Sequence, residues 1–187
     1  AHGKTTTSAM ISCIAVESGI EPTVIIGGEV SALNGNAYNG EGRFVVAEAD
    51  ESDGSFLKLN PYLALVTNIE DDHLDYYGTE ENIYKAFKQF LGNLVEGGKA
   101  ILCVDNAKVK ALAQEIDKAV ITYGLEEADY VAKDICYGVD GTTYKLYYKD
   151  KFVTEVRLIV PGRHNVLNSV GAFVAARERG IADETIL

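Results

Sequence analysis

The stretch Arg43–Asp53 reads RFVVAEADESD, a short and nearly continuous apolar run that ends in four carboxylates. An apolar run of this length is typical of a strand covered by helices on both faces. A second run, Tyr62–Ile69 (YLALVTNI), has the same character and continues into Glu70–Asp75 (EDDHLD). Two buried strands that each end in acidic residues indicate a parallel sheet of the α/β class.

Helical and strand patterns alternate around these two runs. Apolar periodicity predicts helices over Thr5–Ser18, Glu80–Val95, Asn106–Lys118 and from about His164 to Arg179, and Asp183 is expected to cap a further helix. Further strands are predicted at Thr23–Ile26, Lys99–Val104 and Ala119–Tyr123. The segment Val30–Gly42 is rich in Gly, Asn and Ser, so we expect a loop there.

The pattern changes between residues 130 and 160. Three alternating strand patterns follow one another there, which predicts a small antiparallel sheet. The expected fold is therefore α/β: a mostly parallel sheet flanked by helices, like that of P-loop NTPases, with a small antiparallel sheet attached. A length of 187 residues suits one domain, 1–187.

Composition excludes several classes of function. Seventeen Lys and Arg against 28 Asp and Glu give a net charge of -11, which argues against binding to a nucleic-acid backbone. No apolar run reaches the roughly 18 residues of a membrane span. The cysteines, Cys13, Cys103 and Cys136, are odd in number and far apart, so they spell out neither a disulfide framework nor a CxxC metal site. We expect a cytoplasmic protein without a membrane partner.

Gly3-Lys4-Thr5 matches the second half of the phosphate-binding loop motif G-x-x-x-x-G-K-T. In such loops the backbone amides cradle phosphates, the Lys reaches the terminal phosphates and the Thr hydroxyl holds Mg²⁺. The helix predicted directly after it would point its N-terminus at the anion. The alternative is an ordinary helix start, because a GKT tripeptide also occurs by chance.

Both acidic clusters follow predicted strands of the sheet. Ligands of open α/β sheets bind outside the carboxyl ends of the strands, so Lys4, Glu48 and His73 should meet at one edge. Crowded carboxylates are costly unless cations lie among them, which favours divalent metal there. The alternatives are two solvated acidic loops and a structural histidine.

A third polar group follows the antiparallel strands, in PGRHNVLN (residues 161–168). Asn165 and Asn168 are three residues apart, so their carboxamides share one face of a helix start and could contact an adenine edge or a ribose. The alternative is a plain polar first turn with an N-cap.

Four motifs, AHGKTTTSAM, EADESDGSF, VTNIEDDHLDYYG and PGRHNVLNS, together resemble the Mur ligase family of cell-wall peptide synthetases in order and spacing. The match spans essentially the whole chain as the family's central ATP-binding domain. The chain would then be an excised middle domain that lacks the N-terminal UDP-sugar-binding domain and the C-terminal domain.

The resemblance implies an ATP-dependent amide ligation that builds peptidoglycan precursors. The carboxylate of UDP-N-acetylmuramate would take the γ-phosphoryl group of ATP, and the amine of L-alanine would attack the resulting acyl phosphate. By motif, Lys4, Glu48 and His73 would be catalytic. Thr5 and Glu48 would bind one Mg²⁺, and His73 would help to bind a second. The nucleotide-binding residues implied are Gly3, Lys4, Thr5, Thr6, His164, Asn165 and Asn168.

The sequence leaves the roles of some residues unassigned and several functions in competition. Asp50, Glu51 and Asn68 lie near the motifs without an assigned role. Several family members carry a carbamylated lysine on the helix after the DH motif, where this chain offers Lys85 and Lys88, and a solvated lysine is the alternative. Competing functions are a murein tripeptide recycling ligase, a non-catalytic P-loop nucleotide-binding module and a small-molecule kinase.

Overall fold

The structure, a computed structural model that describes residues 2–33 and 35–187, contains a large and a small sheet. The large sheet has the strand order β4-β5-β6-β7-β8-β9. Its strands are β4 (Leu63–Val66), β5 (Lys99–Cys103), β6 (Ala119–Gly124), β7 (Tyr130–Gly138), β8 (Gly141–Tyr148) and β9 (Lys151–Leu158). Pairing is parallel from β4 to β7 and antiparallel from β7 to β9. The predicted α/β class with an attached antiparallel part is confirmed.

The small sheet has the strand order β2-β1-β3 and lies beside the first helix. It consists of β1 (Thr23–Val30), β2 (Gly35–Tyr38) and β3 (Val45–Ala47), with a 3-10 turn, η1 (Ser31–Leu33), between β1 and β2. β3 runs parallel to β1, and β2 runs antiparallel to it. The expected loop at 30–42 was therefore partly wrong, because backbone pairing with β1 holds β2 despite its weak strand formers. Asn34, within that range, lies outside the described residues.

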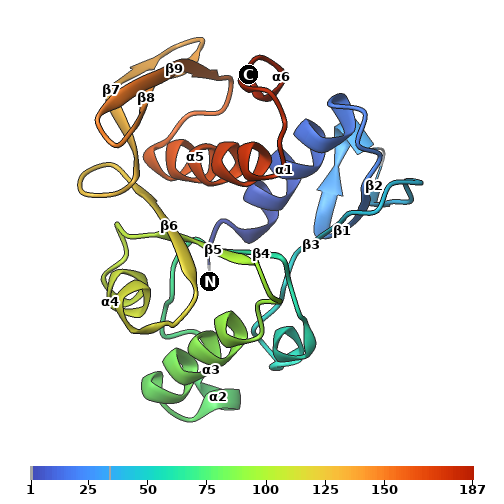
Figure 1. Cartoon of the computed structure of the whole chain (residues 1–187), viewed down its shortest axis with the longest axis vertical. Coiled ribbons are helices and arrows are strands. Elements are labelled where there is room, and N and C mark those ends of the chain that lie inside the picture. Colours follow the sequence, from blue (N-terminus) through green and yellow to red (C-terminus); the bar gives the residue numbers. More distant parts are fainter. Residues whose placement is uncertain (1, 34) are drawn as a thin grey trace.

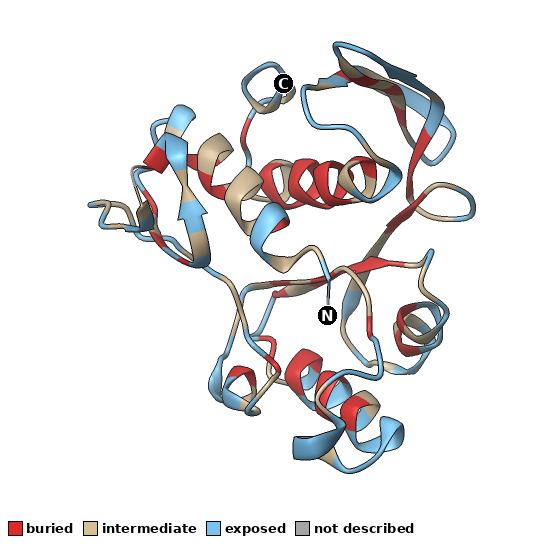
Figure 2. Ribbon diagram, turned by 180° about the vertical axis from the view of Figure 1, so that it is seen from behind, coloured by how far each residue is buried: buried red, intermediate tan, exposed pale blue. Residues whose placement is uncertain are grey.

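Helices cover both faces of the large sheet (Figure 1). On one face lie α1 (Lys4–Glu17) and α5 (Arg163–Glu178), and on the other lie α3 (Glu80–Gly92) and α4 (Ala107–Glu115). β5 shows why both faces must be covered: Ala100 and Leu102 pack in the core under α3, whereas Ile101 and Cys103 pack in the core under α5. Figure 2 shows buried residues on both sides of this layer, as the continuous apolar runs predicted.

Short segments complete the chain: η2 (Ser55–Lys58), α2 (Leu74–Tyr77) and α6 (Asp183–Ile186). The expected cap by Asp183 was wrong. Ala182 is the N-cap residue of α6, without a side-chain cap, and the Asp183 carboxylate instead forms an ion pair with Arg177 at 3.3 Å. Within the described ranges, no helix is both long and apolar enough to cross a membrane.

A gap separates the two sheets. β3 is the last strand of the small sheet, β4 is the first strand of the large one, and a cavity of about 490 Å³ lies between them. α1 and α5 lie along one side of this cavity, so the two sheets are joined by helix packing and not by strand pairing.

Candidate functional site

The site begins at the N-terminus of α1, where Gly3 is the N-cap residue in the left-handed conformation (φ 85°). The Thr7 amide donates to the Gly3 carbonyl at 2.9 Å, which closes the first turn of the helix. A β-carbon at Gly3 would come within 2.5 Å of the Asn168 carboxamide oxygen. Both the backbone conformation and the close approach therefore require glycine here.

The residue before Gly3 is fixed to the end of β4. The His2 amide donates to the Asn68 side-chain oxygen at 2.8 Å, and the Asn68 amide donates to the His2 carbonyl at 2.6 Å. The Thr67 hydroxyl donates to the same carbonyl at 2.7 Å. Asn68 and Thr67 thus hold the start of α1 against the carboxyl end of β4.

Glu48, directly beyond β3, meets the first turn of α1. The Thr5 hydroxyl donates to Glu48 Oε1 at 2.8 Å, and the Gly27 amide donates to Oε2 at 2.7 Å. A β-carbon at Gly28 would lie 2.9 Å from the Thr5 methyl group, and one at Gly27 would lie 3.1 Å from Glu48 Oε2. The absence of side chains at these two glycines therefore lets β1 approach Thr5 and Glu48. The predicted neighbours Thr5 and Glu48 are therefore in direct contact, with Thr6 next to them on the exposed first turn.

Lys4 forms an ion pair with Glu51, at 2.9 Å from Lys4 Nζ to Glu51 Oε2. Glu51 is buried, and the Tyr77 hydroxyl donates to its carbonyl at 2.5 Å. A buried carboxylate is costly without a cationic partner, so this pair ties α1 to the loop after β3. Glu51, which had no assigned role in the sequence, is thus the carboxylate that holds Lys4.

The other carboxylates of this loop shape the loop itself. The Ser52 amide and hydroxyl donate to Asp50, at 3.0 and 2.9 Å, and these bonds lower the pKa of that carboxyl below its ordinary value. The Ser55 amide donates to Asp53 in the same way, at 2.9 Å. Hydrogen bonds therefore offset part of the crowding of negative charge for which the sequence suggested metal ions.

A cavity of about 130 Å³ joins the start of α1 to the start of α5. Gly3 and Asn68 line it from one side, and His164 and Asn168 line it from the other. Burial raises the pKa of the Cys103 thiol at its floor to about 11, so this sulfur stays protonated and is a poor nucleophile.

Asn165 and Asn168 share one face of the first turns of α5, as predicted from their spacing. The Asn168 amide donates to the Asn165 side-chain oxygen at 3.4 Å, and the Asn165 amide donates to the Pro161 carbonyl at 2.7 Å. Asn168 is buried, and its oxygen faces Gly3. The first and last polar motifs of the chain therefore meet.

His73 stands apart from these contacts. It lies in the loop beyond β4, in the left-handed conformation (φ 59°), and no described residue forms a hydrogen bond with its side chain. Across residues 2–33 and 35–187, no three His, Cys, Asp or Glu side chains lie close enough together to hold a metal ion. A metal at this edge would therefore need ligands beyond such side chains.

Lysines compensate the acidic residues farther along the chain. Lys108 on α4 forms ion pairs with Asp71 and Glu80, and Lys88 on α3 pairs with Glu115 at 2.8 Å. Lys88 thus has a carboxylate partner on the neighbouring helix, as a solvated lysine would. Lys108 was not singled out in the sequence, because nothing in its local pattern shows that α4 lies beside the DDH loop.

The comparisons with known proteins agree with this arrangement. The family model described as "Mur ligase middle domain" matches residues 1–176. A UDP-N-acetylmuramate--L-alanine ligase from Syntrophotalea carbinolica is 46% identical over 186 residues, which cover 99% of this chain and 41% of that protein. The chain thus spans less than half of the length of that relative.

Solved structures show the same fold. The crystal structure of UDP-N-acetylmuramate-alanine ligase from Thermotoga maritima superposes with a TM-score of 0.89 at 28% identity, over 100% of this chain and 42% of that one. The MurF ligase from Thermotoga maritima, solved in complex with ADP, superposes with a TM-score of 0.80 at 22% identity, over 100% of this chain and 46% of that one. On the family match over nearly its whole length, the chain belongs to the Mur ligase family, as its middle domain.

Proposed function

We propose that this chain is the ATP-binding part of a ligase that joins L-alanine to UDP-N-acetylmuramate. The observation that carries the proposal is the contact between the Gly3-Lys4-Thr5 turn and Glu48, at a helix N-terminus that also faces Asn168. A helix N-terminus attracts anions, and Lys4 adds a full positive charge beside it. The alanine-adding relative and the similar solved ligase support the choice of substrates.

The residues at this corner suit Mg²⁺ bound together with a nucleotide. Thr5 and Glu48 offer a hydroxyl and a carboxylate oxygen that already lie 2.8 Å apart, and magnesium prefers hard oxygen ligands of this kind. Magnesium also commonly takes only one or two protein ligands and completes its shell with water and phosphate oxygens. When bound, the ion would neutralise charge on the phosphates. His73 would assist a second ion from the loop beyond β4.

Polar groups at the start of α1 and at the start of α5 would bind different parts of the nucleotide. Lys4 would leave Glu51 for the β- and γ-phosphates, and the backbone amides of Gly3, Thr5 and Thr6 would bind the phosphate chain. His164, Asn165 and Asn168 would contact the base or ribose in the 130 Å³ cavity. Transfer of a phosphoryl group needs such positioning and charge neutralisation, without a covalent enzyme intermediate. An acyl phosphate formed on the muramoyl carboxylate would then be attacked by the alanine amine.

Calorimetric titration of the chain with ADP tests the nucleotide site. We expect weak binding that falls by at least about tenfold without Mg²⁺, because Glu48 and the phosphates repel each other in its absence. Lys4→Met should abolish the binding. Lys145→Met, which also removes one lysine from an ion pair, here with Asp134 at 3.0 Å, should leave it unchanged. Tight ADP binding that does not depend on Mg²⁺, or the same ADP affinity in the two lysine variants, would contradict the proposed nucleotide site.

The substrates need the full-length protein. There, ADP release should depend on both UDP-N-acetylmuramate and L-alanine. ADP release with a tripeptide in place of L-alanine would instead favour the recycling ligase. Nucleotide binding without any ADP release would favour a non-catalytic module, and ADP release driven by a small-molecule alcohol would favour a kinase.

A further inference from the structure

The segment that carries His73 has an unusual backbone. Residues 70–78 lead from β4 through α2, and His73 adopts the left-handed conformation (φ 59°, ψ 35°), which residues other than glycine rarely take. A residue in such a conformation persists only where the surrounding structure holds it. The contacts of this segment on either side of His73 therefore decide where its imidazole lies.

Contacts from α4 hold the part of the segment before His73. Lys108 forms an ion pair with Asp71, and the Asn106 side-chain amide donates to Glu70 at 3.4 Å. Both contacts lie at the surface, where ion pairs contribute little to stability. They attach the segment to α4, on the side away from Lys4.

Tyr77 holds the part of the segment after His73. The backbone amides of Tyr76 and Tyr77 donate to the His73 carbonyl, each at 3.0 Å, so Tyr77 lies one turn beyond it. The Tyr77 hydroxyl donates to the Glu51 carbonyl at 2.5 Å. Burial raises the pKa of Tyr77 above its ordinary value, so this hydroxyl stays protonated. One side-chain hydrogen bond thus joins the His73 segment to the loop after β3.

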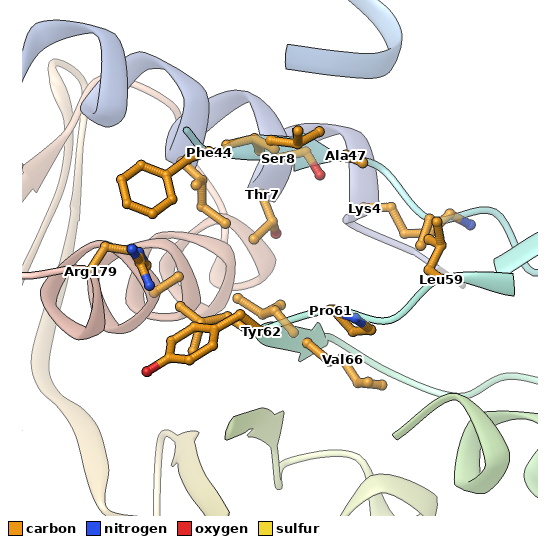
Figure 3. A pocket seen from close by; sticks show the side chains of 18 of the residues that line it. Lys4, Thr7, Ser8, Phe44, Ala47, Leu59, Pro61, Tyr62, Val66 and Arg179 are labelled. Carbon is orange, nitrogen blue, oxygen red and sulfur yellow. The ribbon is translucent and has the colours of Figure 1, made fainter. Parts of the chain in front are cut away.

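Glu51 connects this hydrogen bond to the start of α1. Its carboxylate accepts from Lys4 Nζ, at 3.0 Å to Oε1 and 2.9 Å to Oε2. Figure 3 shows the Lys4 side chain extending from the start of α1 toward the chain that follows β3. Glu51 is only 4% exposed, so the surrounding atoms leave it little room to move. Glu51 therefore binds Lys4 through its side chain and Tyr77 through its backbone.

We propose that Tyr77 is a positioning residue for His73, and that its hydroxyl acts by fixing the segment 70–78 to the loop after β3. The inference rests on the proposed function, in which His73 assists a second metal ion. A ligand whose binding conformation is less populated binds with lower apparent affinity. Loss of the Tyr77 hydroxyl should therefore weaken binding of the second ion and leave the ion at Thr5 and Glu48 unchanged.

Hydrogen exchange of the unliganded chain tests the attachment. Tyr77→Phe removes the hydroxyl and keeps the ring. Tyr76→Phe is the matched control, because Tyr76 lies in the same turn of α2, its ring centre is 4.9 Å from that of Tyr77, and none of the described residues bonds to its hydroxyl. The two amides that donate to the His73 carbonyl should exchange at least about fivefold faster in Tyr77→Phe, because a hydrogen bond of ordinary strength is lost. The control should exchange like the unaltered chain.

Titration with Mn²⁺, followed by electron paramagnetic resonance in the presence of a non-hydrolysable ATP analogue, tests the metal. The unaltered chain should bind two Mn²⁺ ions, and His73→Gln should remove the weaker one. Tyr77→Phe should raise the dissociation constant of the weaker ion at least about threefold and leave that of the tighter ion unchanged. Tyr76→Phe should change neither constant.

The possible results distinguish a failure of this proposal from a failure of the proposed function. A single bound Mn²⁺ in the unaltered chain would contradict the second ion and this proposal with it, but not the nucleotide site at Lys4. Two bound ions with the same affinities in Tyr77→Phe and Tyr76→Phe, or unchanged exchange in Tyr77→Phe, would overturn the role of Tyr77 alone. Equal weakening of both ions in Tyr77→Phe would also overturn it, because the hydroxyl would then support the fold in general and not His73.

Discussion

Two constraints require glycine at position 3: the left-handed backbone conformation and the close approach of Asn168. A substitution at Gly19, which has only the first constraint, separates the two. The φ of 85° at Gly3 costs any other residue about 1–2 kcal/mol, and a β-carbon there would also press on the Asn168 carboxamide. Gly19 has a similar φ of 75° but nothing within 4 Å of a β-carbon. Gly19→Ala therefore measures the backbone cost alone. We expect Gly3→Ala to cost about 1–3 kcal/mol more, the usual range for overpacking.

Urea unfolding of the two variants checks this difference. The midpoint should fall further for Gly3→Ala than for Gly19→Ala, and ADP affinity should fall only for Gly3→Ala. Equal losses of stability would mean that Asn168 moves aside without cost, and that the close approach of α1 and α5 contributes nothing to the site.

Some contacts of single residues in the candidate site could be predicted from the sequence, and others could not. Lys4, Thr5 and Glu48 could be predicted because a loop motif and a strand end each carry a local pattern, and the rule for strand ends brings them together. The pairing of Lys4 with Glu51 could not be predicted. Four carboxylates compete within that loop, and only the fold decides which of them is buried beside the lysine.

At the scale of elements, α5 contains a glycine that its own helical propensity does not explain. A β-carbon at Gly171 would lie 2.9 Å from the Tyr123 hydroxyl, which is buried in β6 and has no hydrogen-bond partner among the described residues. Gly171→Ala should therefore destabilise by about 1–3 kcal/mol, although alanine gains about 1 kcal/mol in helical propensity. Gly92→Ala in α3 meets nothing within 4 Å and should be neutral or stabilising.

Thermal unfolding of the double variant identifies the cause. Tyr123→Phe alone should raise stability, because the orphaned hydroxyl disappears. Combined with Gly171→Ala, it should recover at least half of the loss. Destabilisation that persists in full in the double variant would point to another neighbour, such as the Leu65 methyl group 3.1 Å away.

The boundaries of elements were less predictable than their existence. β4 and β5 lie inside the predicted runs because continuous apolar segments are buried on both faces. The helix predicted to Lys118 ends at Glu115, since Ile116 already adopts an extended backbone (ψ 138°) on the way to β6. β2 was missed altogether, because its pairing with β1 depends on a distant segment and not on its own residues.

For the whole molecule, the divided sheet predicts uneven stability. Among the residues that the structure describes, β5 has a partner strand on each side and its residues 100–102 are fully buried, whereas β3 has one partner strand and Val45 is 64% exposed. The small sheet has a separate apolar cluster around Val24, Ile26 and Leu33 and reaches the rest of the chain mainly through α1. Regions with few buried contacts open locally at lower free energy than the core.

Native-state hydrogen exchange in low urea measures this difference. The amides of β5 should exchange only by global unfolding, with a urea dependence equal to that of the whole chain, because they open only when the full buried surface is exposed. The amides of β1 and β3 should exchange at least about tenfold faster, with a weaker urea dependence, because opening the small sheet exposes less surface. A single free energy and a single slope for both sheets would show that packing of α1 against α5 alone couples them into one cooperative unit.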